Sequence, residues 1–162
     1  MKLYLGIDTS STNTALVLLN GSNGDLLEFV LFSPKQKDIL ERTTEICKLV
    51  DSFLVRNTPL FDLHELEVSI EGASFNSRGR RDKLIMLAGF VYHRMRTLGY
   101  KVNIVAPTSI KKKFTGNGRA QKEEVIAFVP KSIIEEFKVF YRKLDDLADA
   151  YALASITRRG LL

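Results

Sequence analysis

The chain has 162 residues, of which 45% are hydrophobic and 27% are charged, a composition typical of a globular protein and not of a disordered one. Its single cysteine, Cys47, excludes an internal disulfide, and no apolar run approaches the roughly 20 residues that a membrane span needs. Because the N-terminus also lacks the apolar core of a signal peptide, we expect a single domain over residues 1–162, no membrane partner and a cytoplasmic location.

Positive charge is concentrated in the middle of the chain. The net charge is +5, yet residues 76–122 contain twelve lysines or arginines and a single acid, Asp82. The remaining segments contain twelve basic and eighteen acidic residues. A basic middle in an otherwise acidic chain predicts a polyanionic partner, most commonly nucleic acid, and the alternative is a solvated basic face without a partner.

The first half of the chain predicts four strands and one long helix. Alternating apolar residues predict a strand over 3–7, in which Gly6 permits a close approach. Apolar runs predict strands over 14–20 and 26–32, and the short turns between these three strands indicate antiparallel neighbours. Helical spacing predicts a helix from Pro34 to about Asn57, followed by a strand over 66–71.

The second half predicts mainly helices. The expected elements are a helix over 82–98, a strand over 101–105, a short helical turn from 107, a basic loop over 111–119 and helices over 121–129 and 141–159. This order of elements predicts an α/β fold with a five-stranded mixed sheet and helices on both faces.

Acidic residues occur at positions that the predicted fold brings together. Asp8 follows the first strand and Glu71 ends the fourth, and these two strands can be parallel neighbours joined by a crossover helix. Their ends then lie side by side at one edge of the sheet. Asp146 and Asp149 are three residues apart on the last predicted helix, so they project from one face, a turn apart.

Such a group of carboxylates indicates a metal site. Close carboxylates repel one another unless a cation neutralises them, and Mg²⁺ is a hard cation that prefers oxygen ligands. Two ions roughly 3.5–4 Å apart can activate water and stabilise the leaving oxygen in phosphodiester hydrolysis. The alternatives are an Asp8 that caps the following turn and surface acids in salt bridges.

Four segments in chain order resemble the RuvC-type Holliday-junction resolvases. They are GIDTSSTNTA at 6–15, IEGASF at 70–75, IKKKFTGNGRAQKEEV at 110–125 and DDLADAYALA at 145–154. The resemblance runs along essentially the whole chain. It implies a ribonuclease H-like nuclease domain that works as a homodimer. It also implies two Mg²⁺ or Mn²⁺ ions per active site, used to nick two opposing strands of a four-way DNA junction.

The resemblance also assigns site residues by position. It implies that four carboxylates bind metal and are catalytic, namely Asp8, Glu71, Asp146 and Asp149. The family's DxxD spacing selects Asp146, and its rival is Asp145, which also shares a helix face with Asp149. The family's two functionally important lysines, eleven residues apart, correspond to Lys111 and Lys122. We interpret both lysines as phosphate contacts near the scissile bond, with Lys122 in the catalytic set.

Further DNA contacts are predicted in the basic segments. The candidates for holding the DNA backbone are Arg78, Arg80, Arg81, Lys112, Lys113 and Arg119. Phe75 is the nearest candidate for the aromatic residue that helps to open the junction centre in the family. A phenylalanine in a polar, basic loop can stack on an unpaired base, and the alternative is that it packs into the core.

The predicted function is a metal-dependent, structure-selective DNA endonuclease that resolves four-way junctions. The alternatives are a less selective ribonuclease H-like nuclease, a non-catalytic junction-binding protein, and a nucleotide-binding domain of the actin and sugar-kinase type, which needs two domains. The predicted dimer interface is the apolar stripe Leu84, Leu87, Ala88, Val91 and Met95. The same stripe would also serve as a core face.

Overall fold

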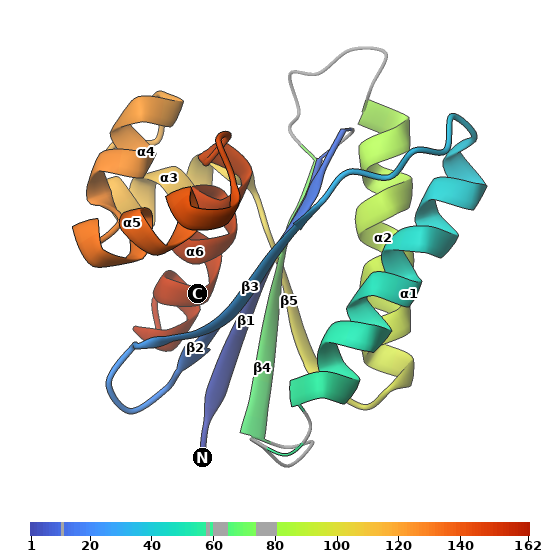
Figure 1. The fold of residues 1–162 in the computed structure, drawn as a ribbon, viewed down its shortest axis with the longest axis horizontal. Coiled ribbons are helices and arrows are strands. Elements are labelled where there is room, and N and C mark those ends of the chain that lie inside the picture. The colour runs from blue at the N-terminus through green and yellow to red at the C-terminus, as the bar shows by residue number, and fades with distance from the viewer. Residues whose placement is uncertain (11, 58, 60–64, 74–80) are drawn as a thin grey trace.

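A computed structural model describes the chain outside residues 11, 58, 60–64 and 74–80 and the side chain of residue 81. It contains one central sheet with helices on both sides (Figure 1). Within the described part of the chain, no helix combines the length and the apolar character that are needed to cross a bilayer.

The sheet has five strands, as predicted. They are β1 (Leu3–Thr9), β2 (Thr14–Asn20), β3 (Leu26–Phe32), β4 (Leu66–Glu71) and β5 (Lys101–Val105). Their order across the sheet is β3-β2-β1-β4-β5. The pairs β1–β2 and β2–β3 are antiparallel, whereas the pairs β1–β4 and β4–β5 are parallel. The mixed sheet and the parallel pairing of the first and fourth strands are therefore confirmed.

Helices cover both faces of this sheet (Figure 1). One face packs against α1 (Ile39–Asn57) and α2 (Arg81–Thr97). The other packs against α3 (Pro107–Thr115), α4 (Lys122–Phe128), α5 (Lys131–Phe140) and α6 (Asp145–Arg158). Each interface is a separate hydrophobic core, because side chains of successive strand residues alternate between the two faces.

The first predicted helix starts later than expected. It begins at Ile39 and not at Pro34, because the side chain of Asp38 caps it. Asp38 Oδ1 accepts hydrogen bonds from the backbone N–H groups of Leu40 (2.9 Å) and Glu41 (3.1 Å). The aspartate, and not the proline, therefore fixes the N-terminus of α1.

The basic loop predicted over 111–119 is helical in its first half. Helix α3 continues to Thr115 and ends at Gly116, whose φ of 86° is favourable for glycine and whose N–H bonds to the carbonyl of Lys112. The lysines at 111–113 consequently lie on a helix and not on a loop.

Helix α5 was not predicted from the sequence, and the last helix begins later than predicted. Ile133 and Phe137, four residues apart, are the buried residues of α5. The segment after α5 contacts the edge strand instead of continuing as helix. There the Tyr141 hydroxyl accepts a hydrogen bond from the backbone N–H of Leu31 (3.2 Å). Helix α6 therefore begins at Asp145 and not at residue 141.

The dimer interface predicted on α2 needs a correction. Leu87, Val91 and Met95 are completely buried against the sheet, and Ala88 is 4% exposed. These side chains form the core face that was the alternative interpretation, so they cannot form an interface. The apolar side chains that α2 exposes are Ile85 and Phe90, with 48% and 46% of their surfaces accessible.

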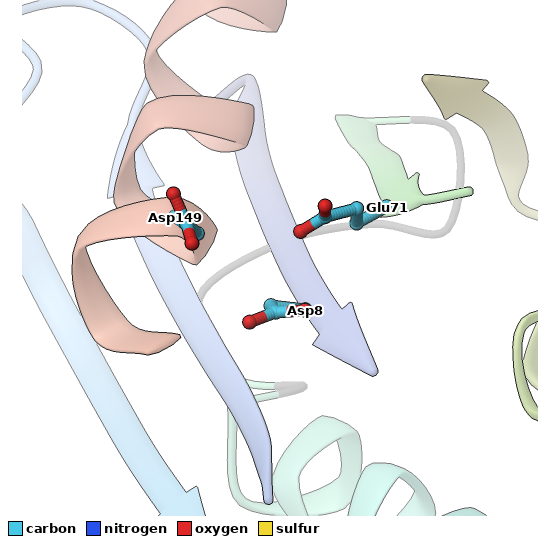
Figure 2. Close-up of side chains that lie close together, drawn as sticks. All are labelled: Asp8, Glu71 and Asp149. Atoms are coloured by element: carbon cyan, nitrogen blue, oxygen red, sulfur yellow. The ribbon is translucent and has the colours of Figure 1, made fainter. Parts of the chain in front are cut away.

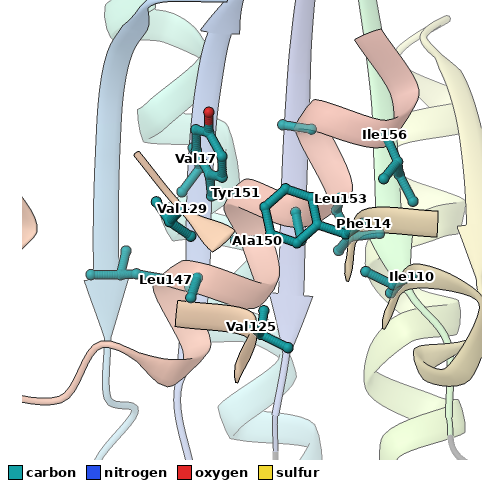
Figure 3. Packing of buried hydrophobic residues seen from close by; sticks show 14 of the residues in the cluster. Val17, Ile110, Phe114, Val125, Val129, Leu147, Ala150, Tyr151, Leu153 and Ile156 are labelled. Atoms are coloured by element: carbon teal, nitrogen blue, oxygen red, sulfur yellow. The ribbon is translucent and has the colours of Figure 1, made fainter. Parts of the chain in front are cut away.

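Helix α6 lies directly on β1, and Gly6 makes this possible. A Cβ atom at position 6 would lie 2.0 Å from the Ala150 carbonyl oxygen and 2.8 Å from the Ala154 backbone nitrogen. Figure 3 shows the residues around this contact, including Ala150 and Leu153 of α6. Small side chains on α6 and a glycine on β1 thus bring the helix close enough to place its first turns beside the end of the strand.

Candidate metal centre

Two carboxylates meet at the end of the parallel strand pair β1–β4. Ile7 of β1 pairs with Ile70 of β4, so the next residues, Asp8 and Glu71, are neighbours across the two strands. Both follow a residue that packs into the core on the α1–α2 side. Their side chains therefore project to the opposite face, where α6 lies.

Asp149 of α6 completes a group of three, which we call the acid cluster: Asp8, Glu71 and Asp149. One carboxylate oxygen from each lies within 4.8 Å of the other two. Figure 2 shows the three side chains converging from β1, β4 and α6. Three segments that are far apart in the sequence thus place oxygen ligands around one point.

Burial and mutual repulsion disfavour negative charge in the acid cluster. Burial, with the nearby Asp149 carboxylate, raises the pKa of Glu71 to about 7. Burial likewise raises the pKa of Asp149 to about 6, and it raises that of Asp8 well above its ordinary range, with Glu71 and Asp149 adding to the effect. Among the described residues, no lysine or arginine forms an ion pair with these three side chains.

The chemistry of the acid cluster fits a divalent metal ion. All three donors are carboxylate oxygens, which are the ligands of hard cations such as Mg²⁺ and Mn²⁺. A bound cation would also remove the repulsion that raises the three pKa values. The arrangement is therefore compatible with a metal centre, and it lacks the paired cations of a structural salt-bridge network among the described residues.

Asp146 lies beside the acid cluster but is not one of its three members. It is buried, and its Oδ2 accepts a hydrogen bond of 2.6 Å from the side-chain amide of Asn13. Asn13 is fixed in turn by the Ser33 hydroxyl, which donates to its Oδ1 at 2.7 Å. The Lys143 ammonium lies 3.9 Å from the same Asp146 oxygen. Asp146 also contributes negative charge that raises the pKa of Asp8.

Asp145, the rival of Asp146, faces lysines. Its Oδ2 forms an ion pair with Lys122 and lies 3.6 Å from the Lys143 ammonium. Burial acts to raise the pKa of Asp145, but these lysines outweigh it and hold that pKa below its usual range. The same ion pair raises the pKa of Lys122.

Lys111 lies on the positive side of the site. Its ammonium donates a hydrogen bond of 2.7 Å to the Ala120 carbonyl, which holds the half-buried side chain in place. Its charge lowers the pKa values of Glu71 and Asp149, against the larger effect of burial. Lys111 is therefore the cation that acts on the acid cluster from α3.

The other predicted DNA contacts divide into described and undescribed residues. Lys112, Lys113 and Arg119 are exposed, and the Lys113 ammonium contacts the Leu161 carbonyl. The remaining predicted contacts lie outside the described residues: Phe75, Arg78, Arg80 and the side chain of Arg81.

Sequence reasoning missed Asn13 and Lys143. Asn13 was part of a Thr/Ser/Asn turn with no feature that set it apart from its neighbours. Lys143 lies in a segment that was predicted to be helical, so its position three residues before Asp146 pointed to no special contact. The Asn13 contact depends on how α6 meets the turn after β1, which no local pattern indicates. The Lys143 contact is local, between residues three apart, and it forms where the chain enters α6.

Comparison with known proteins identifies the family. The family profile described as crossover junction endodeoxyribonuclease RuvC matches residues 4–157. The chain belongs to the RuvC family. A RuvC of Sulfurovum sp. (strain NBC37-1) is 32% identical over 155 residues, covering 93% of this chain and 91% of the relative. A RuvC of Aliarcobacter butzleri (strain RM4018) is also 32% identical over 155 residues, with 93% and 94% covered.

Solved RuvC structures agree with this assignment. The Thermus thermophilus RuvC structure is 25% identical and superposes with a TM-score of 0.70, covering 98% of this chain and 96% of that one. The structure of T. thermophilus RuvC in complex with a Holliday junction substrate gives the same identity and TM-score, with 99% and 97% covered. The predicted family, its ribonuclease H-like fold and its endonuclease class are therefore confirmed.

RuvC proteins are metal-dependent nucleases that resolve Holliday junctions, and the acid cluster of this chain is compatible with that dependence.

Proposed function

We propose that this protein resolves four-way DNA junctions by hydrolysing phosphodiester bonds with Mg²⁺ or Mn²⁺ at the acid cluster. The convergence of Asp8, Glu71 and Asp149 to within 4.8 Å, without a paired cation among the described residues, carries the proposal. We further propose that residues 1–162 act as a single nuclease domain and that the protein works in the cytoplasm.

In this proposal the acid cluster holds the metal ions, and Asp146 adds a fourth carboxylate from the side. Asn13 orients the Asp146 carboxylate through its 2.6 Å hydrogen bond. Two ions held by these carboxylates would supply the Lewis acidity needed to activate water and to stabilise the leaving oxygen. The protein contributes fixed carboxylates, because the tight contact of α6 with Gly6 prevents Asp149 from drifting away from Asp8.

We assign the basic surface around α3 and the N-terminus of α4 to the DNA backbone. Lys111 and Lys122 lie nearest to the acid cluster, where their charges act on its pKa values. The exposed Lys112, Lys113 and Arg119 extend the positive surface away from it. The arginines at 78, 80 and 81 and Phe75 remain predicted contacts.

The homodimer implied by the family requires an interface, and we propose the exposed side of α2. Met86, Gly89, Phe90 and His93 line an apolar depression of about 290 Å³ on this helix. Ile85 and Phe90 are large, exposed apolar residues beside it. Phe90→Lys is expected to give a monomer in light scattering, whereas Val139→Lys, which alters an exposed valine of α5, leaves the dimer intact.

The deciding experiment is cleavage of a synthetic four-way junction in parallel with a flap, a fork and a linear duplex. We expect paired nicks on opposite strands of the junction in Mg²⁺ and none in EDTA. Asp8→Asn should abolish cleavage while leaving junction binding, because the acid holds metal and does not grip DNA. Equal cutting of linear duplex would favour a less selective nuclease, and binding without any nick would favour a non-catalytic junction-binding protein.

A further inference from the structure

Asp145 differs from the other acids near the acid cluster because only one of its two carboxylate oxygens has a partner. Oδ2 pairs with Lys122 and lies 3.6 Å from Lys143, whereas Oδ1 is buried without a hydrogen-bond partner. The side chain is 9% exposed, so the unpaired oxygen is shielded from water. Burying a carboxylate in this way is unfavourable and needs a compensating role.

A half-buried acid, Glu67 of β4, shows what a purely structural pairing looks like. Glu67 of β4 has 11% side-chain exposure and also binds an exposed lysine, Lys101, at 2.8 Å. Its Oε1 additionally accepts a hydrogen bond from Asn103 (3.0 Å), and its Oε2 lies 3.8 Å from the Lys2 ammonium. Both oxygens of Glu67 therefore have partners, and its pairing is away from the acid cluster.

The position of the Lys122 ammonium depends on Asp145, whereas Lys111 is held in place by another contact. Lys111 is half-buried and fixed by the Ala120 carbonyl, at 2.7 Å. The Lys122 side chain is 60% exposed and lies in the first turn of α4, where the contact that fixes its ammonium is the one with Asp145. A free lysine of this kind samples many rotamers, so only a small fraction would place its charge beside the acid cluster.

We propose that Asp145 is a positioning residue that holds the Lys122 ammonium at the edge of the acid cluster, ready to contact the phosphate being cleaved. This inference rests on the proposed function. Asp145 is not a member of the acid cluster, and in this proposal it acts through Lys122. Its free Oδ1 would remain buried, while Oδ2 keeps the lysine in reach.

Two other roles for Asp145 give different outcomes. As an acid in the first turn of α6 it could merely stabilise the helix through the macrodipole. As a metal ligand it would replace Asp146, which shares the same helix turn. The first role predicts a change in stability without a link to Lys122, and the second predicts a loss of divalent-ion binding.

The test is a double-mutant cycle in single-turnover cleavage of a four-way junction. The variants are Asp145→Asn, Lys122→Ala and their combination, with Asp145→Glu as the conservative rescue. Glu67→Gln is the matched control, because it also neutralises a largely covered acid that pairs with an exposed lysine. Thermal shifts with Mg²⁺ and the affinity for the junction are measured on every variant.

We expect Lys122→Ala to slow cleavage about 100-fold and Asp145→Asn about tenfold, with junction affinity within about twofold of wild type in both. The double variant should be no slower than Lys122→Ala alone, because Asp145 acts only through that lysine. Asp145→Glu should recover most of the rate, and Glu67→Gln should cleave like wild type.

Several results would overturn the assignment of Asp145. They are multiplicative losses in the double variant, a wild-type or faster rate for Asp145→Asn, and loss of the Mg²⁺-induced thermal shift in Asp145→Asn. In each of these cases the wild-type protein still cuts the junction, so the proposed function survives. A wild-type protein that cuts no junction would instead remove the proposed function, and the role of Asp145 with it.

Discussion

Two glutamates of β4 show how the same residue type acquires opposite properties within one strand. Glu67 and Glu71 are four residues apart and project to the same face of the sheet, toward α6. Lys101 and Asn103 bind Glu67, at 2.8 and 3.0 Å, and their combined effect exceeds that of burial, so its pKa is lowered. Burial and the Asp149 carboxylate raise the pKa of Glu71 to about 7.

The difference lies in what the fold places opposite each carboxylate. The next strand, β5, supplies both Lys101 and Asn103 to Glu67. At the other end of β4, neighbouring elements place Asp8 and Asp149 beside Glu71, so acids meet acids. An acid that is paired with a cation contributes to structure. A group of acids without a paired cation can instead bind a positively charged ligand.

Substituting the two glutamates should have its largest effect on the rate of junction cleavage. Glu71→Gln should reduce junction cleavage by at least about a thousandfold, because it removes a carboxylate ligand from the metal centre. Glu67→Gln, the same chemical change four residues earlier, should alter the rate by less than about twofold. Single-turnover rates in Mg²⁺, measured at a temperature at which wild type and both variants are fully folded, check both values. Comparable losses in the two variants would show that the distinction between the two glutamates is wrong.

A substitution at the contact between α6 and β1 tests whether that contact creates the acid cluster. In Gly6→Ala, the new Cβ would collide with backbone atoms of α6, the nearest at 2.0 Å. We expect a loss of about 3 kcal/mol or more in the free energy of unfolding, together with weaker divalent-ion binding as Asp149 moves away. Urea unfolding with and without Mg²⁺ measures both effects.

A second glycine serves as the control for this prediction. Gly89 of α2 would meet no atom within 4 Å if it gained a Cβ. Within one chain, Gly89→Ala should therefore stabilise the fold by up to about 1 kcal/mol through helix propensity. Because Gly89 also lines the proposed dimer surface, both glycine variants are compared in the Phe90→Lys background. If Gly6→Ala proved as harmless as Gly89→Ala, the close contact would not be what positions Asp149.

The fold was predictable from sequence because its strands carry simple patterns. All five strands were expected at nearly their observed bounds, since short apolar runs between turns specify them. Helix ends were harder, because they depend on side-chain contacts. The cap by Asp38 and the hydrogen bond from Leu31 to Tyr141 shifted the starts of α1 and α6. Helix α5 was missed although Ile133 and Phe137 have helical spacing.

The acids of the candidate site could be predicted from the sequence, but the side chains that contact those acids could not. Asp8 and Glu71 could be expected together because parallel strands end at the same edge, and the structure brings them within reach of Asp149. Which cation faces which acid depends on long-range packing. The contact of Lys122 with Asp145 joins residues 23 positions apart, and that of Asn13 with Asp146 joins residues 133 apart. No local pattern in the sequence indicates either contact.

The smallest predicted effect concerns stability without metal, where the two glutamates should act in opposite directions. The pKa of Glu71 rises from 4.5 to about 7 on folding, so between these pH values the folded chain binds a proton that the unfolded chain has released. Stability therefore falls as pH rises through this window. Glu67 has a lowered pKa, so its contribution is present above about pH 4.5 and is lost only in more acidic solution.

Glu71→Gln removes the cost of ionising a buried acid, so in EDTA at pH 8 this variant should be more stable than wild type by about 1–3 kcal/mol. The gain should shrink as pH falls and approach zero only below about pH 4.5, where Glu71 becomes protonated in the unfolded chain as well as in the folded one. Glu67→Gln should instead lower the free energy of unfolding by about 1 kcal/mol across pH 5–8, because it removes the ion pair with Lys101. The loss is small because Lys101 is exposed and solvent screens the pair. Urea unfolding at four pH values distinguishes the effects of the two substitutions.

Adding Mg²⁺ should then stabilise wild type more than Glu71→Gln, because the ion binds the folded acid cluster and replaces its protons.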